Sequence, residues 1–460
     1  MREIMSTAEL GNTLPLWSCI PFAGMLLSIA IIPLIRPEWW EKRKAWVVVF
    51  WSLLFLIPFA LAYGMGTASE RFLESMVGDY LTFIVLLFGL FCVTGNISLK
   101  GDIKGTPLTN VILLLISALL SSWIGTTGAS MLMIRPVIRA NKYRMHKTQV
   151  AVFFIFLVSN IGGCLTPIGD PPLLMGFMRG VPFFWSLSLA PVMLLNFILL
   201  LIMFFIIDMI FYKKDEKMGM KYTIKKEDKQ PLKLCGAHNI LFLLMIIGGV
   251  ILSGILPGMP MFQNAEGEVL GLHIFGEVSL TVPTIIEIVI ILLAAFLSLK
   301  TTKKEVREEN HFSWDAIEEV AILFVGIFIT MIPALLILKA KGSELGLDAP
   351  WQMFWATGAL SSFLDNTPTY LVFMTTAGTL GATSGISTVA GIISQQMLMA
   401  ISCGAVFMGA NTYIGNAPNL MVKSIAEENG MKMPSFFGYM GWSLSCLIPV
   451  FIVDMLVFFL

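Results

Sequence analysis

Two carboxylates of this sequence lie where long apolar segments are interrupted by turn-forming residues. Asp170 stands in the run SNIGGCLTPIGDPPLLM, residues 159–175, and Asp365 stands in SSFLDNTPTY, residues 361–370. Proline removes a backbone donor and clashes with the preceding turn, so a regular helix cannot continue through the two prolines after Asp170. Unwound backbone exposes carbonyl oxygens, and hard cations prefer oxygen ligands. Burial raises the pKa of a carboxyl group, whereas a bound cation lowers it. Such an acid can therefore exchange a proton for a cation.

Polar side chains at the same interruptions extend this candidate ligand set. We expect an ion or substrate to be bound by Asp365, Asn366, Thr367, Asp170, Thr126, Thr127, Asn160, Asn411 and Asn416. Among them, Asp365, Asn366 and Thr126 are the candidate Na⁺ ligands. The alternative is structural, because an Asp at such a break can cap the N-terminus of a half-helix and an Asn can pair with frayed backbone.

The composition places these residues inside a membrane protein. Of 460 residues, 57% are apolar and 13% are charged, which excludes an ordinary soluble globular chain. Apolar runs recur from end to end, each near the roughly 20 residues that cross a bilayer. A carboxylate at membrane depth costs roughly 2.5–3.5 kcal/mol on insertion scales, so an acid found there is a functional candidate. The net charge is zero, and nothing in the sequence indicates a nucleic-acid partner.

Cysteine and histidine usage argues against a resident metal or a cofactor. The six cysteines form no CxxC motif, and most of them lie in apolar segments as small buried hydrophobes. The four histidines lie in or beside loops. An intramembrane enzyme would need a nucleophile or metal constellation within the apolar segments, so we expect the chain not to be an enzyme.

The charge of the loops predicts the topology, because Lys and Arg accumulate on the cytoplasmic side of membrane proteins. Basic loops follow the apolar segments that end near residues 35, 97, 140, 212 and 299, whereas residues 257–277 contain Glu but no Lys or Arg. We expect an all-α polytopic fold with about ten transmembrane helices and both termini outside. The expected spans are residues 15–35, 45–63, 79–97, 148–178, 182–212, 239–256, 282–299, 314–338, 395–425 and 436–460.

Two further apolar segments are predicted to be re-entrant hairpins. Residues 107–140 are broken at 125–128 and carry basic residues near both ends, so both ends should lie inside. This segment is too short for two full crossings. Residues 351–377 are broken at 365–368 and form the second expected hairpin, which enters from outside.

The two halves of the chain resemble each other at these breaks. SSWIGTT at 121–127 parallels SSFLDNT at 361–367, and IGDPPLLM at 168–175 parallels IGNAPNLM at 414–421 with five of eight positions identical. Each half has five spans and one hairpin, so the odd number inverts the second half. The expected organisation is a first repeat at 1–212 with its broken helix at 148–178, a cytoplasmic linker at 213–238, and a second repeat at 239–460 with its broken helix at 395–425. Inverted repeats with interrupted helices are typical of secondary transporters, whose site lies between the repeats at the midplane.

These stretches also carry a family resemblance. SNIGGCLTPIGDPP (159–172), SSFLDNTPTY (361–370), GANTYIGNAPNLM (409–421) and, more weakly, WIGTTGAS (123–130) resemble the ion transporter superfamily. Within it, the chain is similar to NhaD-type sodium/proton antiporters and to citrate-transporter-like proteins, relatives of arsenite permeases and divalent anion/sodium symporters. The resemblance covers nearly the whole chain. It implies a homodimer with a rigid scaffold and a transport domain that carries the two hairpins in an elevator-like movement.

The hairpin tips separate two branches of that superfamily. In the sodium-coupled carboxylate branch, each tip reads Ser-Asn-Thr and contributes to a sodium site and to carboxylate binding. Here the second tip reads Asp365-Asn366-Thr367, and the first reads Gly125-Thr126-Thr127. The acid at Asp365 repels an anion and is similar to the Asp-Asn-x-Pro of the antiporters, whereas the altered first tip weakens the expectation of a second sodium site.

The combined prediction is a sodium/proton antiporter. The alternative is a sodium- or proton-coupled symporter of citrate or another carboxylate. We expect a multi-pass protein of the bacterial inner membrane, surrounded by lipid, with no cofactor besides the transported Na⁺ and H⁺.

Overall fold

The computed structural model describes residues 5–219, 230–310 and 312–460 of the chain. Within this part, ten helices are long and apolar enough to cross a membrane. The chain is therefore an integral multi-pass membrane protein of all-α class, which confirms the predicted fold class. His311 and residues 220–229 of the predicted linker 213–238 lie outside the described residues.

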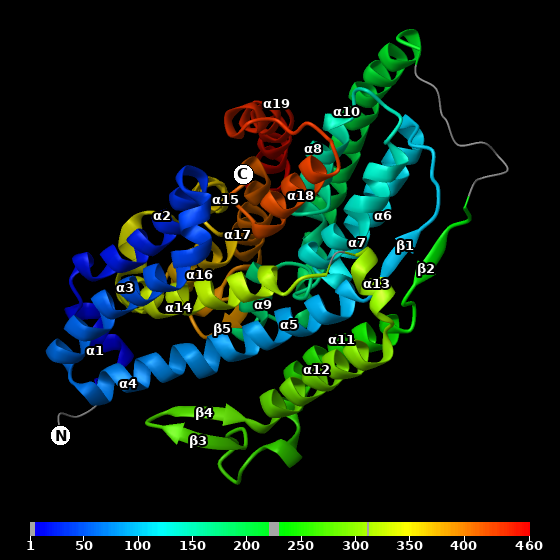
Figure 1. Cartoon of the computed structure of the whole chain (residues 1–460). Coiled ribbons are helices and arrows are strands. Elements are labelled where there is room, and N and C mark those ends of the chain that lie inside the picture. The colour runs from blue at the N-terminus through cyan, green and yellow to red at the C-terminus, as the bar shows by residue number, and fades with distance from the viewer. Residues whose placement is uncertain (1–4, 220–229, 311) are drawn as a thin grey trace.

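Helices dominate both halves, and the strands of the described residues form short two-stranded sheets (Figure 1). The first half contains α1 (Thr7–Thr13), η1 (Leu16–Cys19), α2 (Ile20–Ile35), α3 (Pro37–Tyr63), α4 (Met65–Leu73), η2 (Glu74–Tyr80), α5 (Leu81–Gly95), β1 (Ser98–Lys100), α6 (Pro107–Ile124), α7 (Thr126–Ala140), α8 (Thr148–Leu157), η3 (Ile161–Leu165), α9 (Pro171–Met178), η4 (Phe183–Leu189) and α10 (Ala190–Lys217). The second half contains β2 (Lys233–Cys235), α11 (Asn239–Ile255), η6 (Leu256–Gly258), η7 (Pro260–Phe262), β3 (Gly271–Phe275), β4 (Val278–Thr281), α12 (Val282–Thr301), α13 (Lys304–Glu309), α14 (Asp315–Lys341), η8 (Gly342–Leu345), α15 (Pro350–Ser361), α16 (Asn366–Gly378), β5 (Ile386–Thr388), β6 (Gly391–Ile393), α17 (Gln395–Met408), η9 (Gly409–Asn411), α18 (Ala417–Glu428), α19 (Phe436–Asp454) and η10 (Met455–Phe459). Each strand pair is antiparallel: β1 with β2, β3 with β4, and β5 with β6.

The helices depart from the predicted spans at the start of the third crossing and in the length of α6, whereas residues 395–425 are broken as predicted. The third crossing begins at Met65 rather than near residue 79, because α4, η2 and α5 form one continuous helical segment. Its charged residues are tolerated because Arg71 pairs with Glu74 at 2.5 Å and with Glu70 at 3.3 Å. Residues 395–425 form two shorter helices, α17 and α18, whereas α6 of the first hairpin is long enough by itself to cross.

The segment 107–140 folds into two antiparallel helices, α6 and α7, joined at Gly125. Its two ends meet, because the N–H of Gly105 donates to the carbonyl of Ala140 at 2.9 Å. One turn inside, the amides of Asn110 and Asn141 donate to each other at 2.9 and 2.8 Å. Gly125 alone is non-helical, so the break is narrower than the predicted 125–128. Its φ of 81° lies in the region that favours glycine.

The second hairpin consists of α15 and α16, and its C-terminal end lies beside the end of α14. A Cβ atom added to Gly342, directly after α14, would lie 2.8 Å from Oγ1 of Thr379, directly after α16. The helix α16 begins at Asn366, and Pro368 lies inside its first turn rather than in the break. Proline is tolerated there because the first N–H groups of a helix have no intrahelical partner. That both hairpins re-enter the membrane stays a prediction.

The loops fall into two groups that contact one another within each group. The basic loops lie together: β1 pairs with β2, Asn310 donates to the carbonyl of Ile97 at 3.1 Å, and Thr148 donates to the carbonyl of Lys432 at 2.8 Å. The loops predicted to be outside also contact one another. The N–H of Glu277 donates to Glu70 at 2.9 Å, and Val389 donates to the carbonyl of Arg179 at 2.9 Å. The fold therefore groups the loops as the charge pattern predicted, and the assignment of one group to the cytoplasm stays a prediction.

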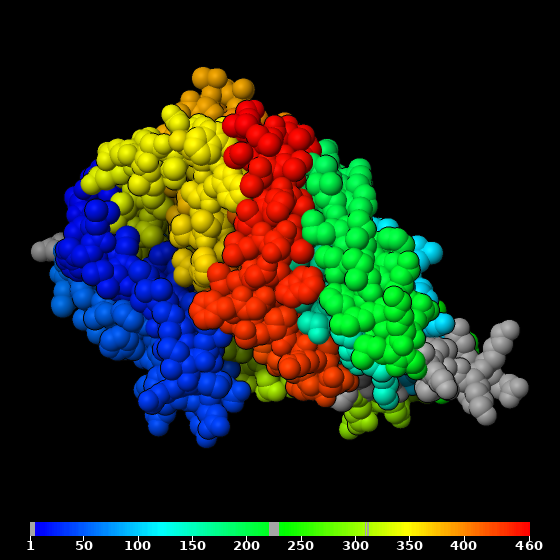
Figure 2. All heavy atoms as spheres, turned by 90° about the horizontal axis from the view of Figure 1, so that it is seen from above, coloured from blue at the N-terminus to red at the C-terminus, as the bar shows by residue number. Residues whose placement is uncertain are grey.

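The two halves interlock through their long helices. The helices α2 and α3 of the first half pack against α14 of the second, and α11 and α12 of the second half pack against α5 of the first. Figure 1 shows α5 running between the α11–α12 pair and the remaining helices. Where α5 meets α14, the rings of Phe83 and Phe324 lie 4.6 Å apart. On the surface shown in Figure 2, the red α19 lies beside the green α10, which it contacts.

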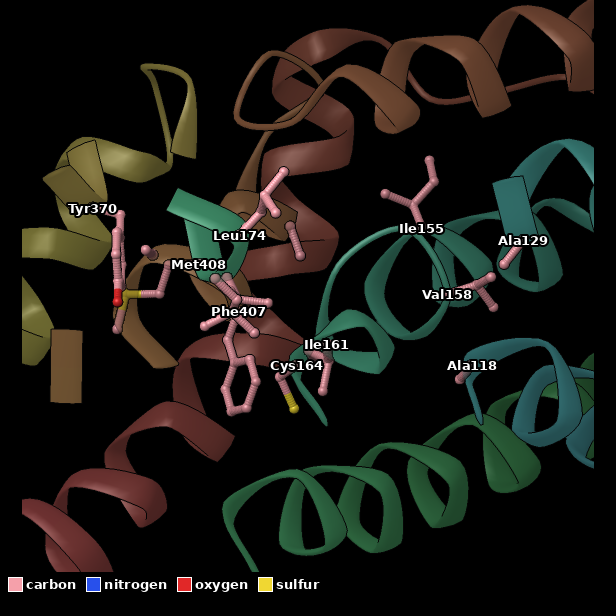
Figure 3. Close-up of a cluster of buried hydrophobic side chains, with 14 of the residues drawn as sticks. Ala118, Ala129, Ile155, Val158, Ile161, Cys164, Leu174, Tyr370, Phe407 and Met408 are labelled. Atoms are coloured by element: carbon pink, nitrogen blue, oxygen red, sulfur yellow. The ribbon is translucent and has the colours of Figure 1, made fainter. Parts of the chain in front are cut away.

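Protein surrounds the interrupted helix of the first half. In the segment Thr148–Leu165, 89% of the residues are buried, whereas only 22% are buried in the most apolar 18 residues of α3. Figure 3 shows Cys164 of η3 and Phe407 of α17 beside each other, so the two interrupted helices share one core. Because unwound backbone in a membrane must be enclosed by protein or line a wet cavity, this burial is what permits the breaks.

Candidate functional site

Asp170 occupies the point where the two hairpin tips meet. Its carboxylate is 0% exposed and accepts hydrogen bonds from both halves of the chain. Thr126 of the first tip donates to Oδ1 at 3.0 Å, and Asn366 of the second tip donates to Oδ2 at 2.7 Å. Asn416, at the break of the second interrupted helix, lies 3.4 Å from Oδ1. The structure therefore brings three of the predicted site residues together around a fourth, Asp170.

Glycines allow this close approach at the first tip. The N–H of Thr126 donates to the carbonyl of Gly169 at 2.8 Å, which fixes the tip of α6–α7 beside Asp170. A Cβ atom added to Gly163 would lie 2.6 Å from Cγ2 of Thr126 and 3.2 Å from Cβ of Asp170. No larger residue fits between the tip and the break without displacing one of them.

The two tips are attached to their interrupted helices in the same way. In each half, the first serine of the Ser-Ser pair donates to a carbonyl near the end of the first half-helix, and a threonine of the break donates back to the second serine's carbonyl. The pairs are Ser121 to Val158 at 2.7 Å and Ser361 to Ala405 at 2.6 Å, then Thr166 to Ser122 and Thr412 to Ser362. The sequence match between 121–127 and 361–367 therefore corresponds to a matching set of contacts.

Asn160 links the two breaks. Its amide nitrogen donates to Oδ1 of Asn419 and to the carbonyl of Ile155, both at 2.8 Å. Its Oδ1 lies 3.2 Å from the amide of Asn416, which also donates to the carbonyl of Ser159 at 3.1 Å. Asn160 thus satisfies exposed backbone and touches a direct partner of Asp170, so both of its predicted roles are compatible with the geometry.

Sequence reasoning missed Asn419. Its amide donates to the carbonyls of Gly409 and Thr412 at 2.8 and 2.9 Å and so holds the second break in shape. The repeat alignment contains a signal for it, because Asn419 replaces the apolar Leu173 at a matched position in an apolar segment. A polar residue gained there needs a buried partner.

Asp365 lies at the second tip and caps α16. Its Oδ1 accepts from the N–H of Thr367 at 2.9 Å, and its carbonyl accepts from the hydroxyl of Thr369, also at 2.9 Å. The side chain is half-buried, whereas Asn366 beside it is fully buried. The capping role considered from the sequence is therefore present, and Asp365 adds a second negative charge near Asp170.

Within the described residues, Asn411 and Thr127 make no hydrogen bond to Asp170 or Asp365. The amide of Asn411 donates to the hydroxyl of Ser362 at 2.9 Å, and its Oδ1 is a buried oxygen without a hydrogen-bond partner in the described part of the chain. Thr127 is half-buried in the first turn of α7. A free carbonyl-type oxygen at the break is a possible ligand for a hard cation.

Four helices begin at this site: α7 at Thr126, α9 at Pro171, α16 at Asn366 and α18 at Ala417. Each helix N-terminus carries the equivalent of roughly half a positive charge, so together they supply about +2. Asp170 and Asp365 can supply about the same negative charge. In the described residues, the hydrogen bonds to these two acids come from Thr, Asn and backbone groups rather than from Lys, Arg or His.

Other buried acids serve different contacts. Asp208 of α10 pairs with Arg144 at 2.8 Å, where both side chains are 0% exposed, and accepts from Asn110 at the base of the first hairpin at 3.0 Å. Asp454 of α19 accepts from Asn196 of α10 at 2.8 Å. Groups of three or more His, Cys, Asp or Glu side chains that could hold a metal ion do not occur in residues 5–219, 230–310 and 312–460.

Ten membrane-crossing helices, with two interrupted helices and two helical tips around a buried carboxylate, define the class of polytopic transporters with a central site. The chain belongs to a family described as "Putative citrate transport", whose model matches residues 11–459. It is thus a secondary transporter, and the expected kinship with citrate-transporter-like proteins is confirmed. A search of curated proteins gave no match to the chain.

Proposed function

We propose that this transporter exchanges sodium for protons at Asp170. The observation that carries the proposal is the position of this carboxylate, which is fully buried and contacted by both hairpin tips. Burial penalises a charged carboxylate, whereas hydrogen bonds and a cation favour it. Asp170 can therefore hold a proton in one step of the cycle and face a sodium ion in another.

The charge of the site supports a monovalent exchange. The helix N-termini contribute about +2, and the two acids contribute about −2 when both are ionised. Replacing a proton on Asp170 by one sodium ion leaves the total charge unchanged. A citrate trianion would make the pocket strongly negative unless several cations entered with it, and uncompensated charge is costly at low dielectric.

The surrounding oxygens suit a sodium ion as substrate. Three side chains that contact Asp170 also carry oxygen atoms. These are the hydroxyl of Thr126 and the side-chain carbonyls of Asn366 and Asn416. Hard cations bind such ligands. Access then alternates when the hairpins and interrupted helices move as one unit against the α2–α5 and α11–α14 helices.

The test uses the purified chain in proteoliposomes that contain a pH-sensitive dye. A sodium jump should move protons without added carboxylate, and Asp170→Asn should abolish this movement. Asp365→Asn preserves a capping side chain but removes a charge, so we expect transport with a roughly tenfold higher KM for sodium, equal to about 1.4 kcal/mol. Asp348→Asn, at an exposed aspartate, is the matched control. Full proton movement in Asp170→Asn would exclude Asp170 as the exchange site.

A second candidate function is cation-coupled citrate symport, which the family description favours. Uptake of radiolabelled citrate in the same vesicles, driven by a sodium or a proton gradient, distinguishes the two. If citrate accumulates and a sodium jump moves no protons, symport replaces antiport. In that case the same acids would serve the coupling cations.

A further inference from the structure

A separate cavity lies at the base of the first hairpin, on the side of the basic loops. It has a volume of about 310 Å³, and three of its lining residues are basic: Lys100, Arg135 and Arg139. Arg135 and Arg139 are one turn apart on α7 and so face the same side of the helix. The opposite wall comes from β1, the loop after it, and Asn310.

Three basic side chains and one acidic side chain line this cavity. Arg139 is already engaged through its bond to the carbonyl of Leu99, and Glu428 of α18 interacts electrostatically with Arg135. Its one acidic lining residue, Asp102, is engaged by the chain itself, because its carboxylate accepts from the N–H of Gln230 at 3.0 Å. Nη1 of Arg135 is buried and has no hydrogen-bond partner within the described residues. A buried charged donor left unpaired is costly, and an oxygen of a bound anion would satisfy it.

The cavity also lies between two parts of the chain that move relative to each other in the proposed transport cycle. Arg135 and Arg139 belong to the hairpin, whereas Lys100 follows α5. The far wall is held in place by Asn310, whose amide donates to the carbonyls of Gly95 and Ile97, both at 3.1 Å. A group bound between them would contact both parts at once.

We infer that this cavity is a binding site for a small oxyanion, a group with the chemistry of phosphate. Guanidinium groups bind such oxyanions through short charge-assisted hydrogen bonds. Occupancy holds the base of the first hairpin against α5 and β1 and therefore slows the movement of the hairpin. The site is distinct from the Asp170 site, which is built from uncharged donors.

Isothermal titration of the full chain in detergent with inorganic phosphate, at constant ionic strength, tests the inference. We expect saturable binding that becomes at least roughly tenfold weaker in Arg135→Gln, the loss of one charge-assisted contact. Arg43→Gln, at an exposed arginine in the N-terminal part of α3, is the matched control and should bind as the wild type does. Lys100→Gln gives a second variant if Arg135→Gln does not fold. Equal affinity in the folded cavity variant, or no binding to the wild type, overturns the inference.

Two further titrations identify the source of the oxyanion and show whether its binding is independent of the transport site. Titration with phosphatidylglycerol micelles in place of phosphate shows whether a lipid headgroup or a free anion binds more tightly. Asp170→Asn should retain phosphate binding even though it loses proton exchange. Loss of phosphate binding in Asp170→Asn would assign the anion to the transport site and overturn the separate cavity site.

Discussion

At the scale of single residues, the donors around Asp170 explain why an acid can remain buried there. Three side chains, those of Thr126, Asn366 and Asn416, donate hydrogen bonds to the carboxylate, and none of them carries a positive charge. An Arg or Lys in their place would hold the carboxylate permanently ionised. With neutral donors, the carboxyl group can be protonated when no cation is bound and ionised when a cation is bound, as an exchange site requires.

Replacing Thr126 by valine tests this arrangement at constant shape. Thr126→Val removes the hydroxyl that donates to Oδ1 of Asp170, and hydrogen bonds to charged groups are worth about 1.5–3 kcal/mol. We expect the KM for sodium to rise by roughly tenfold or more, with protein abundance little changed. Sodium-dependent proton movement in vesicles measures this. The control is Thr301→Val, at an exposed threonine near the end of α12; an unchanged KM in Thr126→Val would contradict the proposed ligand role.

At the scale of the elements, the hairpin tips depend on backbone that only particular residues adopt. The first tip turns within the single residue Gly125, at φ 81° and ψ 149°. The second tip uses residues 362–365 and is capped by Asp365. Equivalent tips thus reach the same carboxylate with different turns.

The first turn predicts a stability effect. A side chain at Gly125 must adopt a conformation that costs about 1–3 kcal/mol in residues other than glycine. Gly125→Ala should therefore lower the thermal unfolding midpoint in detergent and reduce transport. Gly78→Ala is the control, because a Cβ there meets no atom within 4 Å and its φ is not positive. Equal midpoints for the two variants would show that the tip is not strained.

The base of the first hairpin predicts a second effect on stability. Arg144→Met leaves Asp208 buried without its cation, a change that typically costs about 3–5 kcal/mol. Adding Asp208→Asn removes the orphaned charge and keeps a polar partner for Asn110. We expect the midpoint to fall most in the single variant and to recover partly in the double. A double variant no more stable than the single would argue that the two charges do not interact.

At the scale of the whole molecule, each half supplies part of the other half's surroundings. The α2–α3 pair packs on α14 and the α11–α12 pair on α5, so neither half is complete alone. The hairpins, the interrupted helices, α10 and α19 lie outside these two packed groups. In the proposed movement, α2–α5 and α11–α14 form a frame, and the hairpins and interrupted helices form the unit that carries the Asp170 site.

Cross-linking tests the movement between these parts. A Cβ on Gly128 of α7 would lie 3.2 Å from Cβ of Thr94 of α5, slightly closer than the 3.5–4.5 Å of typical disulfides. In a background without the six native cysteines, oxidised Thr94→Cys/Gly128→Cys should lose transport, and reduction should restore it.

The matched control joins two helices of the frame. In Gly249→Cys/Ile290→Cys the corresponding distance is 3.4 Å, and both positions lie in the α11–α12 pair. Its oxidation should leave transport unchanged. Full transport by the oxidised Thr94→Cys/Gly128→Cys protein would show that α7 does not move against α5.

The helix breaks and the grouping of loops were predictable from local signals, and the inverted repeat stays a prediction. Proline and glycine runs mark the breaks around Asp170 and Asn416, and Lys and Arg mark one group of loops. The extent of each break was less predictable. Pro368 fits within a first helical turn and Gly125 alone suffices for a tip, because neighbouring contacts decide where a helix begins.

The sequence by itself determined that this is a membrane protein of two related halves with oxygen-rich interruptions, because hydropathy, charge bias and helix-breaking residues act over short distances. Only the tertiary structure decided that both tips meet at Asp170 and that Asp365 caps α16, since residues 126, 170, 366 and 416 are brought together by packing across the whole chain.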